Sequence, residues 1–377
     1  MSIQVFRPTF DVNACLKEIK ECLEKGWTGM GFKTLQFEEM WKKYTGCTNA
    51  YFVNSATAAL NLAFDILKTE KKWEDDDEVI STPLTFISTN HAILKAGLHI
   101  VFADVDDTLC LNPQDVIKKI TPKTRAICYV AFGGNTGKYA EIVKICQDHN
   151  LSLILDAAHM AGTRLNGKIP GNEADATIWS YQAVKNLPTG DSGMLCFKNA
   201  DYDKIARRKA WLGINQDTFA RTSENGSYKW KYDVEYLGNK YNGNSIMASI
   251  AIAQLPHLDT DNEYRRQIAS WYMKDLSPYS DKIKFINIPE DCISSQHLFQ
   301  IIIEKRDELL QFLNAHDIYP GVHYTVNTEY RMYSYAKGSC PYAEYLSNHV
   351  ISLPVHMALT KTDVSLITNL IIEFINK

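Results

Sequence analysis

One lysine stands in a sequence context that suits covalent chemistry with a carbonyl compound. Lys185 lies in the segment SYQAVKNLPTGDSG, shortly after an apolar run that ends at Ser180. A lysine that is shielded from water has a lowered pKa, and its neutral amine can form an imine with a carbonyl group. A lysine in a surface loop is more often simply solvated. The preceding strand pattern and the glycines that follow nevertheless mark Lys185 as a candidate site residue.

A carboxylate ends a second apolar run. Residues 151–156 read LSLILD, which is typical of a buried strand with Asp156 at its carboxyl end, and His159 follows three residues later. In open α/β sheets, ligands bind outside the carboxyl ends of the strands. Asp156 could instead cap the next helix, and His159 could equally be a packed or capping histidine. The pattern predicts that Asp156 and Lys185 lie close together at one edge of the sheet.

A third segment has the features of an anion site. A short strand runs into a helix whose first turn is small and hydroxylated, with Ser55, Ala56 and Thr57 in the sequence VNSATAAL. Free backbone N–H groups and the helix dipole at such a turn attract phosphate, although ordinary serine and threonine caps look the same. Ser180 could add a hydroxyl to the same group.

An aromatic ring is available in a fourth segment, TPLTFISTN. Phe86 follows the end of a strand there and could stack on a flat ligand, although a core phenylalanine is the commoner reason for such a residue. The chain contains neither GxGxxG nor GxxxxGK[ST], so a Rossmann-type dehydrogenase and the P-loop class lack support.

These segments are positioned by alternating strand and helix patterns. The alternation predicts an α/β protein with a mostly parallel central sheet and helices on both faces. A polar, glycine-dotted and aromatic stretch at 215–244 predicts a long functional loop or subunit contact, and a helix over 246–258 follows. We expect a large domain over 1–250, including the N-terminal segment, and a smaller C-terminal α/β domain over 251–377. The expected strands are 51–53, 79–80, 99–103, 125–132, 151–155, 176–180 and 194–197, and the expected helices are 56–67, 87–94 and 139–149.

Composition narrows the class of protein. The 40 basic and 44 acidic residues give a formal charge of -4, which does not favour nucleic acid or an anionic membrane surface as a partner. The nine cysteines are scattered, odd in number and without a CxxC pair, so we expect reduced core thiols and no metal site. The N-terminal residues do not resemble a signal peptide, and no apolar run approaches membrane-spanning length. A cytoplasmic protein is therefore expected.

Taken together and in this order, the segments resemble the fold-type-I enzymes that depend on pyridoxal 5'-phosphate (PLP), and more narrowly the DegT/StrS group of sugar aminotransferases. The resemblance covers nearly the whole chain and is most specific at LILDAAHMAG and SYQAVKNLPTGDSGML. It extends to GWTGMGFKTLQFEE, NSATAALNLA, TPLTFISTNHAI, LGNKYNGNSIMASIAIAQLPHLD, GVHY and ISLPVHMALT.

The resemblance implies a role for each matching residue. Lys185 would hold PLP as a Schiff base, the internal aldimine, and then move the proton, while Asp156 would pair with the pyridine nitrogen. Pyridoxamine phosphate would form midway, after the amino donor has reacted. His159 would lie near the phenolic oxygen, and Phe86 would stack on the ring. The remaining implied cofactor contacts are Ser55, Ala56, Thr57 and Ser180 for the phosphate, with Lys240 and Asn242 reaching the site of the partner subunit in a homodimer, and the implied substrate contacts are Trp27, Thr28, His323 and Tyr324.

The chain departs from the group's pattern at several positions. Ala56 replaces a usual glycine, Lys240-Tyr241-Asn242 replaces a common Asn-Tyr-Arg triplet, and 325–328 lacks the prolines and second histidine that often follow His323 and Tyr324. The expected function is transfer of an amino group, with glutamate as donor, to a keto carbon of a nucleotide-linked deoxysugar.

Three alternatives stay open at this point. The acceptor could be a small phosphorylated ketone, because the departures lie where substrate is expected. A sugar dehydratase of the same fold is disfavoured, since those relatives carry histidine where Lys185 stands. A non-catalytic sensor built on this fold is disfavoured by the presence of both Asp156 and Lys185.

Overall fold

A seven-stranded sheet forms the centre of the molecule. The computed structural model describes residues 2–215 and 232–377, and within them the strand order of this sheet is β2-β9-β8-β6-β5-β3-β4. Only β9 runs antiparallel to its neighbours, so the predicted mostly parallel α/β sheet is confirmed. The strands are β2 (Tyr51–Val53), β3 (Glu78–Ser81), β4 (His99–Phe102), β5 (Thr124–Val130), β6 (Ser152–Asp156), β8 (Ala176–Ser180) and β9 (Gly193–Phe197).

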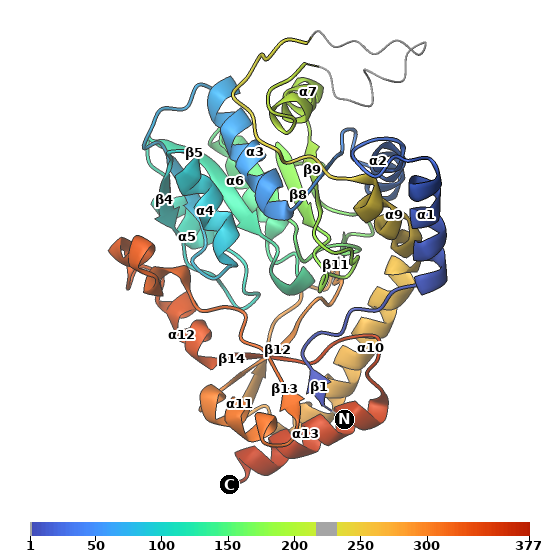
Figure 1. Ribbon diagram of the computed structural model, residues 1–377. Helices are drawn as coiled ribbons and strands as arrows, with labels where there is room; N and C mark the ends of the chain where they lie inside the picture. The colour runs from blue at the N-terminus through green and yellow to red at the C-terminus, as the bar shows by residue number, and fades with distance from the viewer. Residues whose placement is uncertain (1, 216–231) are drawn as a thin grey trace.

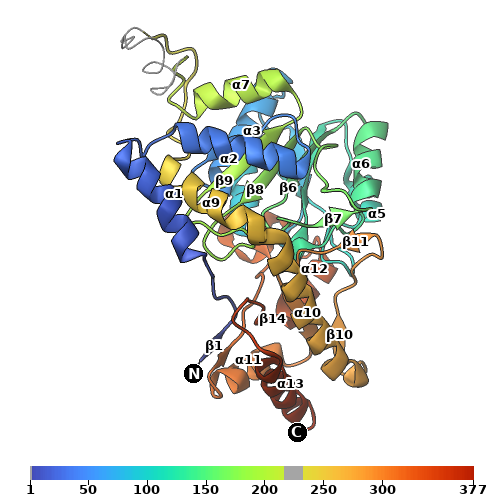
Figure 2. The same cartoon turned by 90° about the vertical axis from the view of Figure 1, so that its right-hand side faces the viewer.

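Helices cover both faces of this sheet (Figures 1 and 2). Their ends follow from local capping: the Ser55 side chain accepts from the Ala58 amide at the start of α3, and the Asn244 side chain accepts from the Met247 amide at the start of α9. The helices are α1 (Val12–Glu24), α2 (Phe32–Thr45), α3 (Ala56–Glu70), α4 (Ile87–Lys95), α5 (Pro113–Lys119), α6 (Tyr139–Asp148), α7 (Ala200–Lys209) and α9 (Ser245–Gln254).

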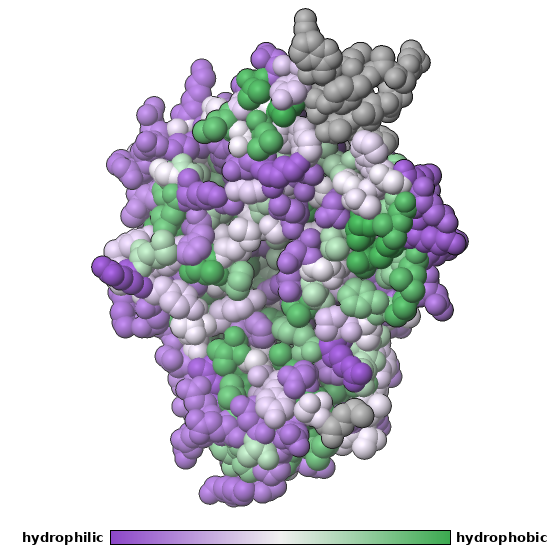
Figure 3. Space-filling model, viewed as in Figure 1, coloured by the Kyte–Doolittle hydropathy of each residue, from purple (hydrophilic) through white to green (hydrophobic). Residues whose placement is uncertain are grey.

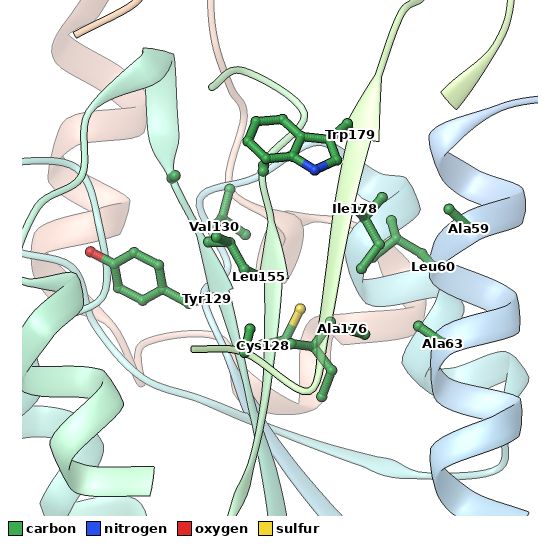
Figure 4. Close-up of a cluster of buried hydrophobic side chains, with 14 of the residues drawn as sticks. Ala59, Leu60, Ala63, Cys128, Tyr129, Val130, Leu155, Ala176, Ile178 and Trp179 are labelled. Atoms are coloured by element: carbon green, nitrogen blue, oxygen red, sulfur yellow. The ribbon is translucent and has the colours of Figure 1, made fainter. Parts of the chain in front are cut away.

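The core holds the sheet rigid beneath the carboxyl ends of its strands. β5, β6 and β8 are buried along nearly their whole length, which explains their continuous apolar sequences. Figure 4 shows Leu60 of α3 close to Ile178 of β8, within a cluster of fully buried side chains. Truncating a side chain in such a cluster costs about 2–5 kcal/mol of stability. Because this packing holds the strands in place, the polar residues at the strand ends have fixed positions.

A smaller α/β unit follows the sheet in the chain and carries a second hydrophobic cluster. Its three-stranded antiparallel sheet has the order β10-β12-β14, and α10 leads into it (Figure 1). The first strand of the chain, β1 (Ile3–Gln4), pairs in parallel with β13 (Ile318–Tyr319) of this unit. The predicted boundary between residues 250 and 251 stays a prediction. The elements are α10 (Leu258–Leu276), β10 (Ile283–Phe285), β12 (Phe299–Ile303), α11 (Arg306–Asn314), α12 (Pro341–His349), β14 (Val350–Leu353) and α13 (Lys361–Ile375).

Shorter elements join these units. The two-stranded sheet of β7 (Arg164–Leu165) and β11 (Cys292–Ile293) links the large sheet's connections to the C-terminal third of the chain. Single 3-10 turns complete the structure: η1 (Phe132–Gly134), η2 (Leu255–His257), η3 (Ser277–Tyr279), η4 (Asn327–Glu329) and η5 (Arg331–Ala336).

The predicted elements of the large sheet all exist, and their ends differ by a few residues. The strand expected to reach Phe132 ends at Val130, because Gly133 and Gly134 have positive φ angles and turn the chain into η1. Residues 216–231 of the predicted loop lie outside the described residues, whereas 232–244 pairs through bridges such as Val53 with Asn242. Across the described ranges, no helix is long and apolar enough to cross a membrane.

Candidate active site

A cavity of about 440 Å³ opens where the carboxyl ends of β6 and β8 meet the first turn of α3. Its walls come from six separate segments of the chain, one of them in the C-terminal third. Ten of the fourteen predicted site residues line it: Ser55, Ala56, Thr57, Phe86, Asp156, His159, Ser180, Lys185, His323 and Tyr324.

Asp156 is the last residue of β6 and lies at the floor of this cavity. One carboxylate oxygen accepts a hydrogen bond from the Thr89 hydroxyl at 2.7 Å, and the other accepts from the Ala158 amide at 3.1 Å. Burial raises the pKa of Asp156, while these two hydrogen bonds and the nearby Lys185 act in the opposite direction. The Asp156 carboxyl is therefore shielded from water, and its pKa depends on Thr89, Ala158 and Lys185.

Lys185 lies in the loop between β8 and β9, and its backbone amide donates to the Gln182 carbonyl at 2.8 Å. Protein atoms surround most of its side chain, while part of it faces the open cavity. Burial lowers the pKa of Lys185 to about 8, and the charge of Asp156 moderates this effect. A substantial fraction of the amine is consequently neutral near physiological pH, as an imine-forming lysine requires.

The first turn of α3 presents free donors to the cavity. Ser55 caps the Ala58 amide at 3.1 Å, and within the described parts of the chain the amides of Ala56 and Thr57 have no hydrogen-bond partner. Gly193 allows β9 to approach this turn, because an added Cβ would lie 2.7 Å from the Ala56 nitrogen. Together with the Ser180 hydroxyl at the cavity wall, the turn suits a phosphate group.

His159 closes one side of the cavity in a fixed tautomer. Its Nδ1 accepts a hydrogen bond from the Gly133 amide at 3.1 Å, so in the neutral ring the proton is on Nε2, which lies 3.4 Å from the Tyr324 hydroxyl. Burial lowers the pKa of His159 well below its usual value, with Lys185 and His323 adding to the effect. His159 is thus a neutral hydrogen-bond donor toward the cavity.

The C-terminal third supplies His323 and Tyr324. The His323 Nδ1 pairs with the Ser352 hydroxyl at 2.9 Å, and burial lowers the pKa of His323 to about 4. Phe86 stands opposite, 56% exposed, with its ring centroid 5.9 Å from that of Tyr324. An aromatic ring exposed at the mouth of a polar cavity is available to stack on a flat ligand.

Four predicted residues do not line this cavity. The Trp27 indole donates to the Met30 carbonyl at 2.8 Å, and the Thr28 carbonyl accepts from the Ser245 amide at 3.0 Å. The Lys240 ammonium lies 3.0 Å from the centroid of the Trp211 ring. Asn242 forms its backbone bridge with Val53. Lys240 and Asn242 are predicted to reach the site of a partner subunit, and Trp27 and Thr28 to contact substrate; all four roles stay predictions.

Sequence reasoning missed several residues behind the cavity walls. Thr89 contacts Asp156, and His297 lies with its ring centroid 4.4 Å from that of His159 while its Nδ1 pairs with Asn186 at 2.8 Å. The sequence pattern around Thr89 points to Phe86 and not to the threonine, and no local pattern marks His297.

Comparison with known proteins agrees with this geometry. The chain is 33% identical to the spore coat polysaccharide biosynthesis protein SpsC of Bacillus subtilis, covering 93% of this chain and 91% of SpsC. It is 30% identical to the dTDP-4-dehydro-2,3,6-trideoxy-D-glucose 4-aminotransferase of Saccharopolyspora spinosa, again covering 93% and 91%. The crystal structure of the aminotransferase TlmJ from Streptoalloteichus hindustanus superimposes with a TM-score of 0.91 at 28% identity, over 100% of this chain and 99% of TlmJ.

The family itself is defined over most of the sequence. Residues 11–371 match the DegT/DnrJ/EryC1/StrS aminotransferase family. The match spans the α3 turn, Asp156, Lys185 and the C-terminal wall of the cavity. The chain therefore belongs to the DegT/DnrJ/EryC1/StrS family of PLP-dependent sugar aminotransferases.

Proposed function

We propose that this enzyme binds PLP at Lys185 and moves an amino group from glutamate to a keto carbon of a nucleotide-linked deoxysugar. The observation that carries the proposal is the meeting of Asp156 and Lys185 in one cavity. The two residues are separated in sequence by β7, β8 and the loops around them. Both nevertheless line the same cavity, where burial lowers the pKa of Lys185 to about 8.

The residues present fit PLP by the chemistry of their donors. The unpaired amides of Ala56 and Thr57, with the Ser180 hydroxyl, would hold the phosphate. Asp156 would hold a proton on the pyridine nitrogen, and Phe86 would cover one face of the ring. When bound in this way, PLP supplies an electron sink for the carbanion that forms at the substrate carbon.

The chain's own residues would move the protons. Because the pKa of Lys185 is about 8, its amine can both accept and return a proton near neutral pH. His159, fixed as a donor at Nε2, would give a hydrogen bond into the cavity without taking up a proton itself. Tyr324 stays a neutral hydroxyl, because burial raises its pKa, and it can donate or accept a hydrogen bond beside the ligand.

The acceptor is inferred from the relatives together with the shape of the site. The Saccharopolyspora spinosa relative acts on a dTDP-linked 4-dehydro sugar, as its name states. A neutral, partly aromatic wall of His323, Tyr324 and Phe86 suits a sugar ring better than a small dianion, which favours the sugar over a phosphorylated ketone.

We further propose a homodimer in which each subunit completes the other's site. Trp27, Thr28, Lys240 and Asn242 lie outside the cavity of their own chain. Val12, Leu16 and Leu23 of the neighbouring α1 are 61%, 60% and 62% exposed, and Figure 3 shows a large apolar area on the side where α1 and α9 lie. Burying this area against a second copy would stabilise the pair.

The experiment uses purified protein incubated with PLP. Glutamate should bleach the visible band of the bound cofactor, and a dTDP-linked 4-keto-6-deoxysugar should restore the band with release of an aminated sugar, detected by mass spectrometry. Dihydroxyacetone phosphate is the matched small acceptor and should restore little colour. A protein that stays colourless with PLP would overturn the proposal, and colour restored only by the small ketone would overturn the choice of acceptor.

The molar mass measured by light scattering after size exclusion tests the dimer. The shared site is tested by mixing two inactive variants and measuring the activity of the mixture. Two inactive variants, Lys185→Ala and a cavity-remote variant Lys240→Glu, should regain activity when refolded together, because one of the two mixed sites is intact. A monomer, or mixing without any gain in activity, would contradict the shared site.

A further inference from the structure

The Asp156 carboxylate is held by a side chain that no motif pointed to. Thr89 in the first turn of α4 donates its hydroxyl proton to the carboxylate at 2.7 Å, although the two residues are 67 positions apart. Thr89 is 1% exposed and Asp156 is 5% exposed, so water cannot readily substitute for this hydrogen bond. Removing the hydroxyl would leave a buried carboxylate oxygen without its donor, which is costly for a charged group.

A second hydroxyl fixes the direction of the first. The Thr85 and Thr89 hydroxyl oxygens lie 3.1 Å apart, and either could donate by geometry alone. Thr89 has a single hydroxyl proton, and Asp156 as a carboxylate can only accept it. Thr85 therefore donates to Thr89, and Thr89 donates to Asp156, which is a polarised chain that ends on the negative charge.

The loop that carries Thr85 is anchored by Asn327 of the C-terminal third. The Asn327 side-chain amide donates to the Thr85 carbonyl at 2.9 Å, and the Asn327 oxygen accepts from Asn90 at 2.6 Å. The Asn327 backbone amide also donates to the Pro83 carbonyl at 2.7 Å. Asn327 thereby holds the segment 83–90, which carries Thr85, with three hydrogen bonds.

We propose that Thr89 is a positioning residue that keeps the Asp156 carboxylate ionised and aimed into the cavity, and that Thr85 orients Thr89 for this task. The inference rests on the proposed function in that Asp156 is taken to face the pyridine nitrogen of PLP. The other groups that face Asp156 are Lys185, whose charge stabilises the carboxylate, and Cys128 and Tyr324, which stay neutral because burial beside Asp156 raises their pKa values.

The test measures the Asp156 carboxyl directly in protein freed of cofactor. Protein labelled with ¹³C at the aspartate carboxyl carbon is titrated by NMR, and the Asp156 resonance is the one missing from Asp156→Asn. Thr89→Val, which removes the hydroxyl at constant shape, should raise the pKa of Asp156 by about one unit or more, and Thr89→Ser should restore it. The PLP dissociation constant should rise by about tenfold in Thr89→Val alone.

Thr368→Val is the matched control. Thr368 is buried in α13 and also donates to a carboxylate, that of Asp275, at 3.1 Å. It belongs to the smaller C-terminal unit and does not line the cavity. This variant should leave the Asp156 titration and the PLP affinity unchanged.

The outcomes separate this inference from the proposed function. An Asp156 pKa that stays within about 0.3 unit of the wild-type value in Thr89→Val would overturn the inference. If Thr89→Val does not fold, Thr85→Val should give a smaller shift in the same direction, and no shift there would overturn it equally. A wild-type protein that binds no PLP would instead overturn the proposed function, while the titration would still decide the role of Thr89.

Discussion

The two walls of the cavity differ in charge. The sheet wall, formed by Asp156, Ser180 and Lys185, holds a carboxylate and an amine whose pKa lies near physiological pH. The C-terminal wall, formed by His323 and Tyr324, is neutral there, because burial lowers the pKa of His323 to about 4 and raises that of Tyr324. Under the proposed function, the sheet wall would carry out proton transfer, which needs titrating groups. The neutral wall would bind the sugar ring through hydrogen bonds and apolar contacts.

The largest effect should come from removing the amine of the sheet wall. Lys185→Ala should lower turnover by about 10⁴-fold or more, because under the proposed function both the covalent attachment of PLP and the proton transfer would depend on this side chain. Single-turnover kinetics with glutamate would measure it, with Lys185→Arg as the control that keeps the charge. Turnover within tenfold of the wild type would remove Lys185 from the mechanism.

Asp156→Asn should act on both chemistry and titration. We expect turnover to fall by roughly 10²–10³-fold, since a neutral amide cannot hold the proton on the ring nitrogen. The charge of Asp156 raises the pKa of Lys185, so the variant should lower that pKa below about 8. The rate of PLP uptake against pH would then reach its plateau at lower pH than in the wild type. A plateau that moves to higher pH would show that the two side chains do not interact as their positions indicate.

Gly193→Ala tests the close approach of β9 to α3. The added Cβ would lie 2.7 Å from the Ala56 nitrogen and 2.8 Å from the Trp179 carbonyl oxygen, both backbone atoms that cannot rotate away. Such overpacking costs about 1–3 kcal/mol, and the displaced turn should weaken PLP binding as well. Thermal unfolding and PLP titration would measure both effects. Gly29→Ala is the control, because its Cβ would meet no atom within 4 Å.

The smallest effect concerns His323 in the neutral wall, and it should appear in the pH dependence of the free energy of unfolding. An unfolded histidine binds a proton below about pH 6.5, whereas His323 in the folded protein does so only near pH 4. The unfolded state therefore binds more protons between these values, and the free energy of unfolding falls as pH decreases through this window. His323→Asn should flatten this fall slightly in denaturant titrations. Equal slopes in the wild type and the variant would show that His323 is accessible to water.

The sequence predicted one wall of the cavity far better than what lies behind it. Asp156 and Lys185 each end or follow a run of apolar residues, so a local pattern revealed both. Thr89 has no such signal, because a threonine in the first turn of a helix usually caps free backbone amides of that helix. Its partner Asp156 is 67 residues away in the sequence. His297 was missed for the same reason, since its contact with Asn186 spans 111 residues.

The prediction of the fold has the same limit: continuous apolar sequence marks the buried strands, but it does not mark where the backbone turns. The buried strands were recognised because burial on both faces leaves continuous apolar sequence. The apolar pattern predicts the end of β5 two residues too late, because Phe132 continues the pattern while the positive φ angles of Gly133 and Gly134 turn the backbone. The apolar pattern indicates which residues are buried. The direction of the backbone after β5 depends instead on Gly133 and Gly134, which have no side chain and so add nothing to that pattern.

The pairing of β1 with β13 has a consequence for synthesis on the ribosome. Ile3 and Gln4 leave the ribosome long before their partners Ile318 and Tyr319, which follow more than 300 residues later. At the elongation rates of about 5–20 residues per second, the first strand waits on the order of 15–60 s for its neighbour. During that interval the backbone N–H and C=O groups of Ile3 and Gln4 that pair with β13 in the folded protein have no strand beside them.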